Sequence, residues 1–116
     1  MAGAYPHFKT NYSQEELAEE FLLTSGERGF ISTFRGDANR RRVAILLKVL
    51  PYLGYFPVSI QHVPVGIHPF ISGQLGPLEH ENLEYPRDSR TYDRHKDRVR
   101  AYKDWRAATA RNKEEL

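Results

Sequence analysis

The segment of residues 37–50 constrains the fold of this chain more than any other. Drawn as a helix, it is apolar on most sides: Val43, Leu46, Leu47 and Leu50 form one face, and Ile45 and Val49 extend it. A helix that is apolar on most sides is buried among other helices. We therefore predict an all-α fold, a compact bundle of about five to six short helices with this one at its centre. Such a bundle is compatible with helix-turn-helix-like elements.

The start of this helix carries charges that a helix start disfavours. Gly36 supplies a flexible corner, and Asp37 is a suitable N-cap, whose carboxylate accepts from first-turn N–H groups. Arg40, Arg41 and Arg42 follow at once. Each cation near the positive end of the helix dipole costs about 0.3–1 kcal/mol. We therefore expect these arginines to bind an anionic partner, such as a nucleic-acid backbone, rather than to stabilise the helix.

Two earlier helices are predicted from their capping residues. Ser13 and Glu16 have the spacing of a capping box, and Leu17 and Phe21 give the helix that follows a buried stripe. Thr24 or Ser25 caps a short second helix, which we expect to end at Gly36.

The prolines shape the predictions for the middle of the chain. Pro51 should distort or stop the central helix. Residues 58–63 are compatible with a short extended piece. Pro64 fits the first position of a fourth helix, which runs to Gln74 or Leu75 and is kinked at Pro69.

The last third of the chain has its own helix signals. Residues 78–85 predict a short fifth helix, and Ser89 caps a sixth, on which Tyr92, His95 and Val99 share one contact face. We expect an N-terminal tail over residues 1–12, one helical domain over 13–106 and a frayed tail over 107–116.

Charge is distributed unevenly along the chain. Residues 35–48 hold five basic and one acidic group, net +4, and residues 87–106 hold eight basic and four acidic groups, also net +4, in a chain of net charge +2. Arg90, Arg94 and Arg98 stand one helical turn apart in the second block; a solvated, salt-bridged face is the alternative interpretation of that row. The predicted DNA contacts are Arg35, Arg40, Arg41, Arg42, Lys48, Arg90, Arg94 and Arg98.

Several kinds of site are not indicated. The chain has no cysteine, its five histidines lack metal-ligand spacing, and neither a P-loop nor a nucleophile-elbow motif occurs. We expect no catalytic residue, metal, cofactor, small-molecule ligand or membrane partner. The N-terminus lacks a signal peptide, so a cytoplasmic protein is expected.

The order of several short motifs resembles a known family. The motifs are Tyr12 to Leu17, the Arg-Gly-Asp-Ala-Asn-Arg segment at 35–40, the Leu-Gly-Tyr-Phe-Pro turn at 53–57, Gln-Leu-Gly at 74–76 and Arg90 to His95. Together they resemble the N-terminal part of the large replicative transposases of the Tn-three family, over roughly residues 12–106. No single motif is long, but their order and spacing are fairly specific.

The resemblance implies a mostly helical bacterial domain that helps to recognise the terminal inverted repeats of a transposon, on double-stranded DNA in the nucleoid. The family's catalysis resides in a distant C-terminal ribonuclease-H-like domain, so this chain should bind DNA without cutting it. Two alternatives stay open. The domain could dock on the rest of the transposase or on a second protomer, or it could be an inert truncated remnant.

Overall fold

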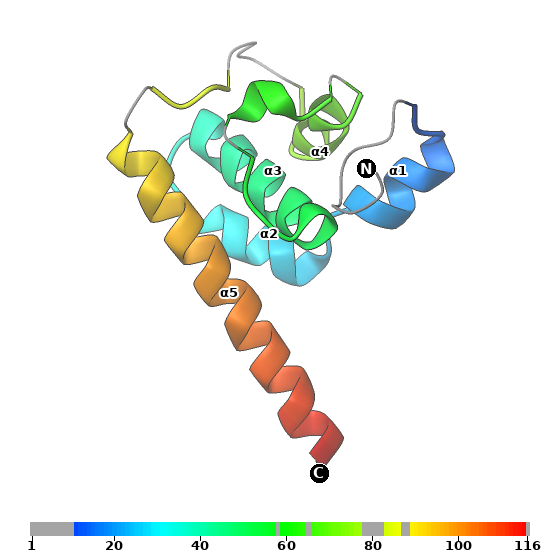
Figure 1. Ribbon diagram of the computed structural model, residues 1–116, viewed down its shortest axis with the longest axis vertical. Coiled ribbons are helices and arrows are strands. Elements are labelled where there is room, and N and C mark those ends of the chain that lie inside the picture. The colour runs from blue at the N-terminus through cyan, green and yellow to red at the C-terminus, as the bar shows by residue number, and fades with distance from the viewer. Residues whose placement is uncertain (1–10, 58, 65, 78–82, 87–88, 116) are drawn as a thin grey trace, which may run out of the picture. The chain divides into compact units, whose positions relative to one another are not determined.

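A computed structural model describes residues 11–57, 59–64, 66–77, 83–86 and 89–115, with backbone alone at position 61 and at 108–115. These residues are all-α, as predicted, and hold no strand. The elements are α1 (Gln14–Phe21), α2 (Ser25–Ser32), α3 (Asp37–Leu53), the 3-10 turn η2 (Ile60–His62), α4 (His68–Gly73) and α5 (Arg90–Glu115) (Figure 1). The chain divides into two compact units, Met1–Tyr85 and Pro86–Leu116.

Helix α3 is the centre of the first unit. It contacts α1, α2 and α4, which surround it (Figure 1). Its buried apolar residues are Val43, Ala44, Ile45, Leu46, Leu47, Val49 and Leu53. The prediction of a central core helix is therefore confirmed.

The end of α3 lies beyond its proline. Pro51 removes a single backbone donor, and the helix continues to Leu53. Gly54 then ends it in the left-handed conformation, with φ +83°, and donates its N–H to the carbonyl of Leu50 at 2.7 Å. The chain thus stops the helix with a glycine C-cap rather than with the proline.

Both short N-terminal helices begin with capping boxes. Ser13 and Glu16 cap α1 reciprocally, as predicted. Thr24 and Glu27 do the same for α2, so Thr24 rather than Ser25 is the cap. Helix α2 ends at Ser32, earlier than expected, because Gly36 belongs to the start of α3.

The middle of the chain corrects two predictions. Residues 60–62 form a 3-10 turn where an extended piece was expected. Helix α4 begins at His68, not at Pro64, and Pro69 therefore lies in its first turn. A proline there causes no kink, because first-turn N–H groups lack helical partners in any case. Of the predicted fifth helix, residues 83–85 are not helical and 78–82 lie outside the described residues.

The second unit is built on α5. Ser89 caps it, since its Oγ accepts from the N–H of Tyr92 at 3.2 Å. His95 and Val99 are its buried side chains, both on the predicted contact face. Helix α5 continues to Glu115, through most of the segment 107–116 that we expect to fray; residue 116 lies outside the described residues. None of the described helices has the length and apolar character needed to cross a membrane.

Candidate nucleic-acid interface

The start of α3 differs from the prediction in its cap. Gly36, with φ +87°, occupies the N-cap and has no side chain to offer, whereas Asp37 is the first helical residue. The carboxylate of Asp37 accepts instead from Nε of Arg41 at 2.8 Å, one helical turn later. Asn39 helps to hold the corner, since its Nδ2 donates to the carbonyl of Arg35 at 3.1 Å.

Arg41 lies inside the first unit, with 2% of its surface exposed. Its Nη1 donates to the carbonyls of Ser72 at 2.6 Å and Gly76 at 3.1 Å, and its Nη2 donates to that of Pro77 at 2.7 Å. The guanidinium thus joins the start of α3 to the end of α4 and the turn that follows. The expectation that this arginine serves something other than stability is corrected: its charge is used by Asp37 and three carbonyls, and no side is left for a phosphate.

Arg42 also points into the protein. Its Nε and Nη2 donate to the carbonyls of Leu83 at 2.8 Å and Glu84 at 2.9 Å, and its Nη1 donates to Oδ1 of Asn39 at 3.1 Å. The guanidinium carbon lies 5.0 Å from the ring centroid of Tyr85, a cation–π distance. Arg42 therefore anchors the last residues of the first unit.

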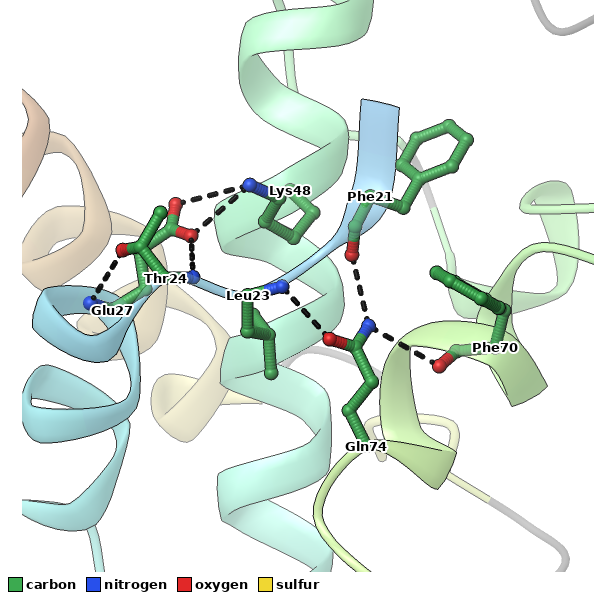
Figure 2. Close-up of polar contacts among 7 residues, drawn as sticks. All are labelled: Phe21, Leu23, Thr24, Glu27, Lys48, Phe70 and Gln74. Carbon is green, nitrogen blue, oxygen red and sulfur yellow. Dashed lines mark hydrogen bonds and ion pairs between the residues drawn. The ribbon is translucent and has the colours of Figure 1, made fainter. Parts of the chain in front are cut away.

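Lys48 forms a largely buried ion pair with Glu27. Its Nζ lies 3.0 and 3.3 Å from the two carboxylate oxygens, and the side chains are 14% and 7% exposed. The same carboxylate accepts from the backbone N–H of Thr24 at 2.8 Å (Figure 2). Glu27 thus links the cap of α2 to the middle of α3, and the charge of Lys48 is neutralised within the fold.

Arg35 and Arg40 are exposed beside this corner. Arg40 is held in place, because its Nε donates to the carbonyl of Phe34 at 2.7 Å and its Nη2 to that of Ser32 at 3.3 Å. Neutral carbonyls orient its guanidinium without cancelling the charge. Of the basic residues predicted in this block, these two remain at the surface.

The three arginines predicted on α5 are all exposed. Arg90, Arg94 and Arg98 follow one another at four-residue spacing, as the sequence indicates. Nη2 of Arg94 lies 3.4 Å from the hydroxyl oxygen of Thr91. The acidic residue Asp93 pairs with Lys96 at 3.5 Å.

Gln74, the first residue of the Gln-Leu-Gly motif, has a structural role. Its Oε1 accepts from the N–H of Leu23 at 2.8 Å, and its Nε2 donates to the carbonyls of Phe21 at 2.9 Å and Phe70 at 3.3 Å (Figure 2). The side chain therefore binds the last carbonyl of α1 and a backbone N–H of the short link between α1 and α2. Nη1 of Arg28, which the sequence reasoning missed, donates to the backbone carbonyl of Gln74 at 3.1 Å.

The pKa values of His68 and Tyr52 are shifted. Burial lowers the pKa of His68, although the charge of Glu84 partly opposes this, and Nδ1 of His68 is buried without a hydrogen-bond partner. The hydroxyls of Tyr12 and Tyr52 share a hydrogen bond of 2.9 Å, which together with burial raises the pKa of Tyr52 to about 12. Within the described ranges, no group of three histidine or carboxylate side chains is placed to hold a metal ion.

The geometry and the motif order together describe a helical module that presents arginines at two places, one on each unit. The chain belongs to the family described as a domain of unknown function, DUF4158, whose model matches residues 2–116. No solved structure matches it.

Proposed function

We propose that this chain is a DNA-binding module of a replicative transposase of the Tn-three family. It helps to bind the terminal inverted repeats of the transposon, in the bacterial cytoplasm. The support is the order of its motifs, which resembles the N-terminal part of those enzymes. The resemblance assigns catalysis to a separate C-terminal domain, so the module binds DNA and leaves cutting to that domain.

The observation that carries the proposal is the row of exposed arginines on α5. Arg90, Arg94 and Arg98 stand at four-residue spacing, where like charges repel by roughly 0.2–0.5 kcal/mol per pair. Such a row weakens an isolated helix, but it is favourable once phosphates lie beside it. Arginine suits this role because its planar fork binds phosphate oxygens bidentately.

The first unit adds a second, smaller set of contacts. Arg35 and Arg40 are exposed at the start of α3 and belong to the proposed DNA surface. Arg41, Arg42 and Lys48 are not included in the proposed DNA surface, because their charged groups are bound to carbonyl or carboxylate groups within the fold.

The test is a titration of the whole chain into fluorescein-labelled duplex DNA of random sequence. Binding is measured by fluorescence anisotropy at several salt concentrations. Binding should weaken steeply with salt, because each neutralised phosphate releases counterions. In a plot of log K against log salt concentration, each such phosphate contributes about 0.9 to the downward slope. Replacing Arg90, Arg94 and Arg98 together by glutamine should reduce the slope by about 2–3. Absence of binding at low salt refutes the proposal.

A second function is favoured by one observation on α5. Trp105 is 58% exposed, its ring lies 6.1 Å from that of Tyr102, and the guanidinium carbon of Arg106 lies 5.9 Å from its centroid. Exposed tryptophan beside tyrosine and arginine is typical of protein-binding hot spots. Under this alternative a second protomer docks here. Sedimentation would then show salt-insensitive self-association that Trp105→Ala abolishes.

A further inference from the structure

A cleft in the first unit is lined by residues from three separate parts of the sequence. It has a volume of about 250 Å³ and is lined by Arg28, Ile31 and Ser32 of α2, Asp37 and Arg40 of α3, and Leu75 after α4. Such a space accommodates a small anionic group together with part of its hydration.

The charges around the cleft favour an anion. Among the described residues, no carboxylate lies within ion-pair distance of Arg28 or Arg40. The carboxylate at the wall, that of Asp37, is bound to Arg41. Two arginines without a carboxylate partner of their own therefore border the same space as the ion-paired Asp37.

Both guanidinium groups are already oriented. Arg40 is bound to two backbone carbonyls, and Arg28 to the carbonyl of Gln74. Each keeps further N–H donors, because a guanidinium has five and these bonds use only some of them. Less side-chain entropy is lost on binding when a group is ordered beforehand.

The start of α3 adds to the positive potential beside this cleft. The N-cap Gly36 provides no side-chain acceptor, so the first-turn N–H groups have no side-chain cap. The helix dipole places partial positive charge at the same end. The start of α3 thus adds partial positive charge at its side of the cleft, whereas the last turn of α2, with Ile31 and Ser32, adds partial negative charge, so the two arginines supply the attraction for an anion.

We propose that this cleft holds one phosphate group of the DNA backbone, gripped from two sides by Arg28 and Arg40. This inference rests on the proposed function and names one of its contacts. A phosphodiester suits two guanidinium groups better than a carboxylate does, because it has four oxygens around a tetrahedral phosphorus, against two in one plane, and so offers acceptors in more directions. Arg28 thereby becomes a DNA contact in the first unit, although it lies outside both basic blocks of the sequence.

The decisive experiment compares single and double variants by the salt dependence of duplex binding. Arg28→Gln and Arg40→Gln should each lower the slope by about 0.9, and the double variant should lower it by about the same amount, since one phosphate is lost in all three. The matched control is Glu19→Gln, which removes one exposed charge on α1, outside all proposed contacts, and should leave the slope unchanged. Melting by circular dichroism confirms that each variant is folded.

The outcomes separate this inference from the function on which it rests. If the unaltered chain binds no DNA, both fail. If DNA binds but the Arg28→Gln slope equals that of Glu19→Gln, or the double variant loses twice the slope of each single one, the shared-phosphate contact alone is wrong.

A second readout needs no DNA. Titration with dimethyl phosphate should shift the Nε–H NMR signals of Arg28 and Arg40, and acetate at equal concentration should shift them much less. Equal shifts with acetate, or none with dimethyl phosphate, overturn the assignment of a phosphate.

Discussion

Replacing Arg41 by methionine should destabilise the first unit strongly. Methionine has a similar length and no donor, so the change removes all four hydrogen bonds that Arg41 makes. Removing one partner of a buried, hydrogen-bonded charge pair costs about 3–5 kcal/mol. Relief of the helix dipole returns about 0.3–1 kcal/mol. The expected net loss in the free energy of unfolding is therefore about 2–5 kcal/mol.

The assay is urea unfolding followed by far-UV circular dichroism, with thermal melting beside it. For a unit of this size, each kcal/mol moves the melting temperature by roughly 4–8 °C, so a fall of about 10 °C or more is expected. The matched control is Arg40→Met, one position earlier on the same helix. It removes an equal charge at an exposed site and should cost less than about 1.5 kcal/mol.

The two variants distinguish the structural role of Arg41 from the role that the sequence suggested. Equal unfolding midpoints for Arg41→Met and Arg40→Met, or an Arg41→Met protein more stable than the unaltered chain, would refute the buried placement of this guanidinium. Under conditions where both variants are folded, Arg40→Met should weaken DNA binding and Arg41→Met should not.

Three further predictions concern partly buried polar groups of the first unit. Gln74→Glu keeps the acceptor but loses both donated bonds, so urea unfolding should show a loss of about 1–3 kcal/mol. The lowered pKa of His68 means that the unfolded chain binds a proton more readily, so stability should fall as the pH drops below 6.5, and urea titrations of His68→Gln should show a weaker fall. The pKa of Tyr52, near 12, means that stability should decline as the pH rises from 10 toward 12; absorbance titration of Tyr12→Phe should show this pKa moving back toward 10.

The features that could be predicted from the sequence are local ones. The capping boxes at Ser13 and Thr24 join residues three positions apart, and the apolar surface of α3 is a pattern within one helix. These signals depend on neighbours along the chain. They were therefore available without any knowledge of how the helices pack.

The role of Arg41 could not be predicted in the same way. Its carbonyl acceptors lie 31 to 36 residues further along the chain, and every residue has a carbonyl, so no residue type marks them. One local signal was present: Asp37 and Arg41 have the four-residue spacing of a helical ion pair, although Arg40, three residues after Asp37, also has a spacing that permits one. The start of α4 was misplaced for a similar reason, because Pro64 and Pro69 both fit a first turn.

Arg41 and Arg42 of α3 bind carbonyls that lie later in the chain, and this affects the order in which the chain folds during synthesis. Helix α3 is made before the acceptors of Arg41 and Arg42, the last of which, the carbonyls of Leu83 and Glu84, follow Arg42 by 41 and 42 residues. Until they arrive, the first turn of α3 carries cations at the unfavourable end of its dipole. A nascent chain that stops before Leu83 already holds the acceptors of Arg41 but lacks the two carbonyls that bind Arg42, so the last residues of the first unit complete the anchoring of this turn.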